Sequence, residues 1–175
     1  MAAPEPEPSP FFRAHTGALR EAARLGPVLD LACGEGRYAL ATAALGIPCV
    51  AMDRSAPALR SLAGRARPRA LPAWPVRADL ETPHGIPARP GVFGAVLVFR
   101  FLYRPLAPAI ADALRPGGLL LYETFTHRQR ELGQGPVNPA FLLDEGELPR
   151  LFPGLEVLCY EEGLLASLAA RKPRI

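Results

Sequence analysis

The feature that most constrains the fold is the segment Val28–Tyr38, in which an apolar strand runs into a glycine-containing turn and then a helix. Gly34 and Gly36 lack a Cβ atom, so the backbone there can turn tightly and a ligand can approach the main-chain amides. The helix that follows begins with N–H groups that have no partner inside the helix. Nucleotide-type ligands bind where such a strand ends, although short glycine turns also serve as plain connectors.

Strand-like and helix-like runs alternate from Pro27 onward, which is typical of a parallel sheet with helices on both faces. The pattern predicts an α/β fold with a seven-stranded, mostly parallel sheet in a single domain, residues 11–175, behind a flexible leader, residues 1–10. The predicted strands are residues 28–31, 48–52, 73–78, 92–99, 119–125, 156–161 and 164–170. The predicted helices are residues 12–24, 37–45, 55–64, 105–114 and 144–152.

Composition excludes several classes of protein. A chain of 175 residues with 49% hydrophobic residues suits one globular domain, and its longest apolar runs are too short to cross a membrane. Residues 1–10 lack the features of a secretory signal. The three cysteines, Cys33, Cys49 and Cys159, are widely spaced with no histidine at ligand spacing, so we expect neither disulfides nor a metal site. These features favour a cytoplasmic protein without a membrane partner.

The charge pattern bears on nucleic acid as a partner. The net charge is +3 and the pI is about 9.0, but the arginines are scattered among aspartates and glutamates rather than gathered in a run. The sequence therefore leaves nucleic acid open without indicating it.

Two carboxylates follow predicted strands. Asp53 comes directly after the second strand, where a carboxylate can accept hydrogen bonds from both hydroxyls of a ribose. Asp79 ends the third strand, where it could meet an adenine amino group. Helix capping and solvation are the competing interpretations, since Asp53 also precedes a helix start.

With these residues the chain resembles the class I S-adenosylmethionine-dependent methyltransferases. The first motif of that family matches Asp30–Gly36, with Ala32 where glycine is common, and the turn Pro116-Gly117-Gly118 matches as well. The resemblance implies a Rossmann-like fold, S-adenosylmethionine as cofactor, and a role for Asp30 in placing the methionine amino group. The residues that it implies for cofactor binding are Asp30, Ala32, Cys33, Gly34, Gly36, Asp53, Arg54, Asp79, Leu80 and Phe99.

A closer resemblance is to small bacterial methyltransferases of the tellurite-resistance type and their uncharacterised relatives. The segments that carry it are Ser9–Phe11, Leu29–Leu40, Phe99–Pro105, Tyr122–Phe125 and Asn138–Leu143.

A dinucleotide such as NAD is the competing ligand, because residues 34–39 also satisfy the GxGxxG/A pattern. Asp30 inside the first strand, Asp79 after the third and the short chain favour S-adenosylmethionine.

Candidates for the acceptor side lie at the ends of the fourth and fifth predicted strands, which face the same crevice as the cofactor. We predict Arg100, Glu123 and Tyr103 as substrate-side residues. Arg100 would contact an anionic acceptor or form a structural salt bridge, and Glu123 would be a general base or a buried ion partner. Whether a general base is used at all stays open, because His15, His84 and His127 each have a simpler structural interpretation.

In-line methyl transfer needs alignment and exclusion of water more than catalytic side chains. The irregular stretch of residues 126–143 is a candidate cover for the substrate. Because little chain lies outside the cofactor fold, we expect a small-molecule acceptor. An RNA or protein methyltransferase and a non-catalytic S-adenosylmethionine-binding module are the alternatives.

Overall fold

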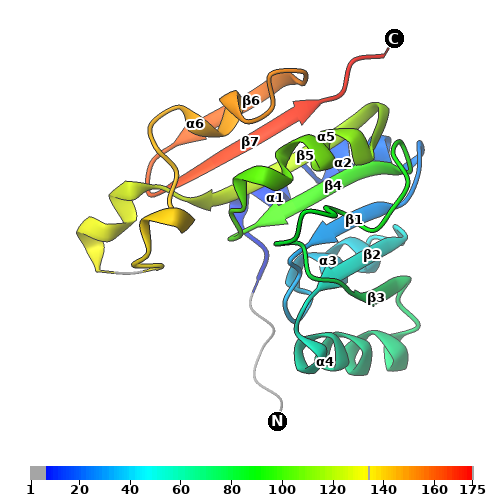
Figure 1. The fold of residues 1–175 in the computed structure, drawn as a ribbon. Helices are drawn as coiled ribbons and strands as arrows, with labels where there is room; N and C mark the ends of the chain where they lie inside the picture. Colours follow the sequence, from blue (N-terminus) through cyan, green and yellow to red (C-terminus); the bar gives the residue numbers. More distant parts are fainter. Residues whose placement is uncertain (1–6, 134, 175) are drawn as a thin grey trace.

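A computed structural model, which describes residues 7–133 and 135–174, places seven strands in one sheet in the order β3-β2-β1-β4-β5-β7-β6 (Figure 1). Strands β1 to β5 run parallel, and β7 runs antiparallel to both β5 and β6. This confirms the predicted mostly parallel α/β sheet. The strands are β1 (Val28–Leu31), β2 (Cys49–Asp53), β3 (Ala73–Arg77), β4 (Phe93–Phe99), β5 (Leu114–Phe125), β6 (Glu156–Glu162) and β7 (Leu165–Arg171).

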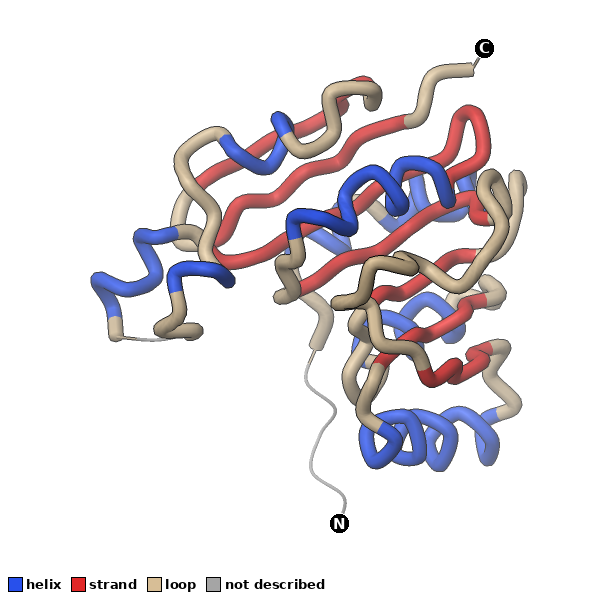
Figure 2. The backbone as a smooth tube through the Cα atoms, viewed as in Figure 1, coloured by secondary structure: helices blue, strands red, loops and turns tan. Residues whose placement is uncertain are grey.

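Helices cover both faces of this sheet (Figure 2). Leu97 and Leu121 face the side covered by the four N-terminal helices, whereas their neighbours Val96 and Leu120 face the side covered by the two later ones. The central strands are therefore apolar on both faces, as buried parallel strands must be. The helices are α1 (Pro10–Ala14), α2 (Thr16–Ala23), α3 (Arg37–Ala44), α4 (Ala56–Ala66), α5 (Ala107–Ala113) and α6 (Glu147–Arg150).

The N-terminal segment departs from the prediction of one helix over residues 12–24. It forms two helices that meet at His15, whose ring Nδ1 lies 2.8 Å from the main-chain oxygen of Phe11. The hydroxyl of Thr16 donates to the carbonyl of Arg13, so side chains compete for the carbonyls of the first helix. The predicted leader, residues 1–10, lies mostly outside the described residues, and Ser9 caps α1, which begins at Pro10.

Strand β5 begins earlier than predicted. Leu114 pairs with Phe93, the register shifts, and pairing resumes between Leu119 and Ala95. The predicted turn between them is thus an irregularity within the strand, where Gly117 takes a φ of +82°. Because Leu114 already pairs with β4, the strand begins at residue 114 and not at the predicted residue 119.

The carboxyl ends of β1, β2 and β4 meet at one edge of the sheet, and the strand order reverses between β1 and β4. Ligands of open α/β sheets bind at such a switch point. Beyond the end of β5, two 3-10 turns, η3 (His127–Leu132) and η4 (Pro139–Phe141), project past this edge (Figure 1). None of the helices among the described residues has the length and apolarity needed to cross a membrane.

Candidate functional site

The backbone of the turn after β1 adopts left-handed conformations at three positions, which favours residues with little or no side chain. Ala32, Gly34 and Gly36 all take positive φ, at 51°, 53° and 83°. A Cβ atom on Gly36 would lie 2.3 Å from Cδ1 of Leu62 on α4, so this position cannot carry a side chain unless Leu62 moves. The positive φ of Ala32 explains why glycine suits that position too.

Asp53, at the end of β2, fixes this turn. Its Oδ2 accepts a hydrogen bond of 2.8 Å from the main-chain N–H of Gly34, and its Oδ1 accepts one of 2.8 Å from Ser55. Each carboxylate oxygen retains a lone pair, because a carboxylate has about four acceptor sites. Asp53 can therefore hold the glycine turn and still accept from two neighbouring hydroxyls of a ligand.

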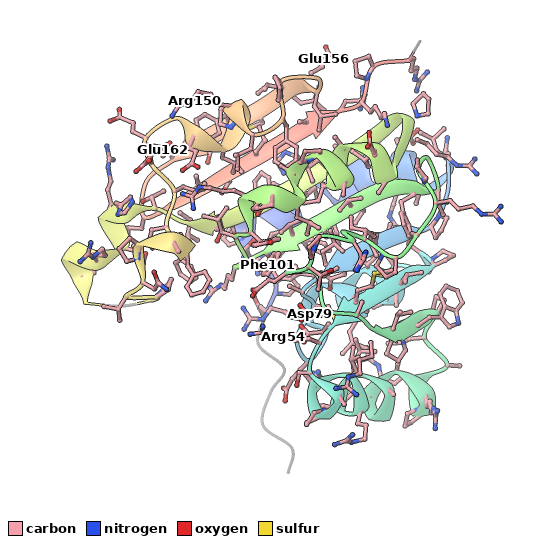
Figure 3. The ribbon with its side chains drawn as sticks, viewed as in Figure 1. Arg54, Asp79, Phe101, Arg150, Glu156 and Glu162 are labelled. Atoms are coloured by element: carbon pink, nitrogen blue, oxygen red, sulfur yellow. The ribbon has the colours of Figure 1, made fainter. Side chains whose placement is uncertain are left out.

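A first cavity of about 160 Å³ opens beside Asp53. Asp79 lies two residues beyond β3, where its Oδ1 accepts from the main-chain N–H of Glu81 at 3.0 Å. Its other oxygen lies at an exposed position and can accept from a ligand. Figure 3 places Arg54, Asp79 and Phe101 at the same end of the sheet. The lining residues are Ala32, Asp53, Arg54, Ala78, Asp79, Leu80, Glu81 and Phe101.

A second cavity of about 330 Å³ shares Ala32 with the first and contains a buried carboxylate. Asp30 is 1% exposed, and its Oδ2 has no hydrogen-bond partner among the described residues. Burial, together with the negative charge of Asp53, raises the pKa of Asp30 to about 8. A cationic ligand would stabilise the ionised form of this buried carboxylate and would bond its unpartnered oxygen. The lining residues are Asp30, Ala32, Cys33, Gly34, Glu35, Arg37, Tyr38, Arg65, Phe99 and Arg100.

Stacked aromatic rings form one wall of the second cavity. The rings of Tyr38, on α3, and Phe99, at the end of β4, stack with centroids 3.7 Å apart and an angle of 15°. Phe12 of α1 packs edge-on against Phe99, with centroids 6.1 Å apart. The N-terminal helix therefore packs against the aromatic wall of this cavity, to which Phe99 belongs.

A third cavity of about 260 Å³ lies under the segment after β5. It adjoins the other two cavities, because Arg100 also lines the second and Phe101 also lines the first. Arg100 takes a φ of +57°, and its main-chain N–H donates to the carbonyl of Glu123 at 2.8 Å. The lining residues are Arg100, Phe101, Leu102, Thr124, Phe125, Pro136 and Phe141.

The sequence of residues 28–118, more than half of the chain, matches the model of the methyltransferase domain family. The chain belongs to this family. The resemblance to methyltransferases is thus confirmed at the level of the domain, and the fold places the matched residues around the first two cavities.

Solved methyltransferase structures share the fold. A methyltransferase from Methanosarcina mazei that is named as S-adenosylmethionine-dependent aligns over 97% of this chain and all of its own, with 17% identity and a TM-score of 0.73. TehB from Haemophilus influenzae aligns over 90% of this chain and 62% of its own, with 20% identity and a TM-score of 0.71. Magnesium protoporphyrin IX methyltransferase from Synechocystis PCC 6803, solved with S-adenosylhomocysteine, aligns over 92% and 81%, with 13% identity and a TM-score of 0.70. No curated protein matches the sequence.

Of the three substrate-side residues predicted for this methyltransferase, the structure brings only Arg100 to the third cavity. Glu123 is 4% exposed, and its Oε2 accepts from the hydroxyl of Ser167 at 2.9 Å, because the two residues pair across β5 and β7. Tyr103 packs half-buried against the core. Neither Glu123 nor Tyr103 is among the residues that line the three cavities.

The histidines of the methyltransferase lie away from these linings. His15 contacts a carbonyl of α1, and His127 pairs with Asp144 at 3.3 Å on the surface. His84 lines a separate hollow beside α5. None of the three is among the residues that line the three cavities.

Sequence reasoning missed several residues of the site. Tyr38 lies two residues after the first motif, and only the fold shows its stacking on Phe99. Phe125 and Phe141 lay in segments that carry the closer resemblance, and the tertiary structure brings them together in the third cavity. Arg104, a neighbour of the predicted Tyr103, donates to the carbonyls of Ala140 and Leu142 at 2.9 Å and pairs with Glu147, so it fixes the segment that carries Phe141.

Proposed function

We propose that this methyltransferase transfers a methyl group from S-adenosylmethionine to a small molecule held in the third cavity. The observation that carries the proposal is that the three cavities adjoin one another: Ala32 lines both the first and the second, and Arg100 lines both the second and the third. A cofactor spanning the first two would present its methyl group toward an acceptor in the third.

The residues fit the chemical groups of this cofactor. Asp53 has acceptor capacity for the ribose hydroxyls, and the positive-φ turn at Gly34 gives close access to main-chain amides. Asp79 and Leu80 offer a polar group and an apolar surface for adenine. The unpartnered, buried Oδ2 of Asp30 suits the methionine ammonium group, which would replace the missing hydrogen-bond partner.

The cofactor supplies a methyl group already activated on a sulfonium sulfur, so the protein has to align and enclose the reactants. Phe99 and Tyr38 wall the second cavity, and Phe101 lies between the first and the third, since it lines both. Such packing excludes water and holds the acceptor in line with the methyl group. Alignment of this kind supports the in-line displacement that we propose.

A small acceptor is supported by the third cavity, which measures about 260 Å³ and is mostly apolar in its lining. Among proteins of similar fold, magnesium protoporphyrin IX methyltransferase and geranyl diphosphate methyltransferase are named for small molecules. The likeness to TehB agrees with the proposal that the nearest relatives are of the tellurite-resistance type. We also propose residues 11–175 as the catalytic domain, and a cytoplasmic location in which Cys33, Cys49 and Cys159 stay reduced.

Calorimetry with S-adenosylhomocysteine and with NAD tests the cofactor proposal. We expect binding of the sulfur compound and none of NAD. Binding of NAD alone would refute the proposal. A second measurement, release of S-adenosylhomocysteine during incubation with a set of small acceptors, separates an enzyme from a binding module: cofactor binding without turnover of any small molecule would favour the module, and turnover of RNA or protein would favour a macromolecular acceptor.

A further inference from the structure

The third cavity is apolar and contains one charge. Phe101, Phe125 and Phe141 supply aromatic walls, and Arg100 is the one charged residue among the described residues that line it. The guanidinium carbon of Arg100 lies 5.6 Å from the centre of the Phe125 ring, so the cation is held over an aromatic wall. A bound molecule thus meets aromatic surface on several sides and a positive charge where the cavity joins the cofactor site.

The described residues that line this cavity include no group that could remove a proton. Among the described residues that line it, none is a histidine, carboxylate, lysine, cysteine or tyrosine. Glu123, the one carboxylate of β5, accepts from Ser167 on β7 through its Oε2 and is not among the residues that line the cavity. A positioned general base contributes about 10²- to 10⁴-fold to rate. An acceptor that must first lose a proton therefore gains no such help from the described lining residues.

A buried hydroxyl adds one neutral donor. Thr124 lines the cavity, is 1% exposed, and its Oγ1 has no hydrogen-bond partner among the described residues. Buried hydroxyls are normally paired, so a ligand that accepts a hydrogen bond would satisfy it. Arg100 and Thr124 together suit an anion at the end of an apolar molecule.

From this arrangement we propose that the acceptor is a small aromatic thiol, bound as its thiolate with Arg100 as counter-ion. The inference rests on the proposed function. A cavity of about 150 Å³ holds benzene, so about 260 Å³ admits one substituted ring. A thiol ionises more readily near neutral pH than an alcohol does, and its thiolate is strongly nucleophilic without a base.

The reaction balances without a proton transfer to the protein. The thiolate electron pair forms the new sulfur–carbon bond, the bond between the methyl carbon and the sulfonium sulfur breaks, and its electron pair stays on the cofactor sulfur. An anion and a cation give two neutral products. An apolar cavity favours such loss of charge, because water stabilises the charged reactants more than an apolar environment does and so raises the barrier to their reaction.

The experiment compares four acceptors on one ring: 4-nitrothiophenol, 4-nitrophenol, 4-nitroaniline and 4-nitrobenzoate, each with S-adenosylmethionine and with product identified by mass spectrometry. We expect kcat/KM for the thiol to exceed that for each other compound by about 100-fold or more. The pH profile should follow the ionisation of the thiol itself and move when thiophenol replaces its nitro derivative. Comparable turnover of the phenol, amine or benzoate, or a profile fixed by the protein, would overturn the inference.

A binding measurement tests the role of Arg100 without turnover. The absorbance of 4-nitrothiophenolate in the complex with S-adenosylhomocysteine reports the pKa of the bound thiol. We expect Arg100→Met to raise that pKa by about one or more, and Arg100→Lys to restore most of the effect. Thr124→Val should weaken thiolate binding by about 3- to 10-fold. An unchanged pKa in Arg100→Met would remove the counter-ion role.

The two proposals fail separately. A protein that does not bind S-adenosylhomocysteine would refute the proposed function and this inference with it. A protein that binds it and methylates some other small molecule, but no thiol, would refute the aromatic thiol alone.

Discussion

The main-chain N–H of Gly34 donates a 2.8 Å hydrogen bond to Oδ2 of Asp53, so the carboxylate that follows β2 holds the glycine turn that follows β1. The second oxygen holds the start of α4 through Ser55. One side chain thus organises the turn and offers acceptors to the ligand.

This relationship predicts the effect of Asp53→Ala. Two main-chain donors and two ribose hydroxyls lose a charged acceptor, so S-adenosylhomocysteine should bind more weakly by on the order of 2–4 kcal/mol. Because Asp53 is half-buried and bonded to the backbone, thermal stability should fall as well. Asp79→Ala is the matched control: its carboxylate is exposed and accepts one main-chain bond, so binding should weaken less and the Tm should change little. Calorimetry on folded Asp53→Ala that shows the wild-type Kd would remove Asp53 from the site.

The buried Asp30 predicts a pH dependence of stability. Its pKa is raised to about 8 in the folded protein from an ordinary value of 3.8, so the folded state keeps a proton that the unfolded state has lost. The free energy of unfolding should therefore decrease as the pH rises from about 4 to about 8, with a slope of up to about 1.4 kcal/mol per pH unit. Urea titrations across this window should show the decrease in the wild type and a flatter profile in Asp30→Asn. Identical profiles for the two proteins would contradict the prediction.

The same residue predicts proton release on cofactor binding. An ammonium group beside Asp30 favours the carboxylate, so binding of S-adenosylhomocysteine near pH 7 should release close to one proton. Calorimetry in two buffers of different ionisation enthalpy measures this number. Asp30→Asn should abolish the release and weaken binding, whereas Asp79→Asn should leave the release intact. Release that persists in Asp30→Asn would assign the proton to another group.

Two glycines of the first turn form a matched pair. Gly36→Ala puts a Cβ 2.3 Å from Leu62 at a φ of +83°, so we expect a loss of about 3 kcal/mol from overpacking and backbone strain. In Gly34→Ala the new Cβ atom has no neighbour within 4 Å, so only the positive φ of +53° is unfavourable. We expect this substitution to lower the free energy of unfolding by about 1 kcal/mol. Urea denaturation measures both. Equal losses would show that Leu62 does not limit Gly36.

Replacing Arg104 should impair methyl transfer without changing the affinity for the cofactor. Arg104 binds Glu147 and two carbonyls of the segment that carries Phe141, and this contact lowers the pKa of Glu147. Arg104→Met should cost about 1–3 kcal/mol of stability and reduce methyl transfer while the Kd for S-adenosylhomocysteine stays unchanged. Arg24→Met, which breaks an exposed pair with Glu21, should change stability by less than about 0.5 kcal/mol. Since a lowered carboxylate pKa contributes stability above its ordinary value, the difference between Arg104→Met and wild type should shrink as the pH falls below about 4.5. A difference that stays constant to low pH would contradict the ion pair.

The sequence by itself determined the parts of this protein that depend on local chemistry. Val28–Leu31 is a short run of three aliphatic residues and Asp30, and Gly34 and Gly36 can adopt the positive φ that follows it, so the first strand and its turn could be predicted residue by residue. The alternation of strands and helices fixed the parallel sheet, and parallel strands place their carboxyl ends at one edge. Asp30, Asp53 and Asp79 were therefore expected at the edge where the first two cavities lie.

Tertiary structure alone decided the acceptor side. Glu123 and Thr124 are adjacent in β5 and so point to opposite faces, and only the tertiary structure shows that Thr124 lines the third cavity while Glu123 accepts from Ser167. Phe141 reaches the same cavity from a segment whose position depends on Arg104, a residue far away in the chain. Contacts between residues far apart in the chain follow from packing of whole elements, which hydrophobic periodicity does not encode, and they decide which side chains meet the substrate.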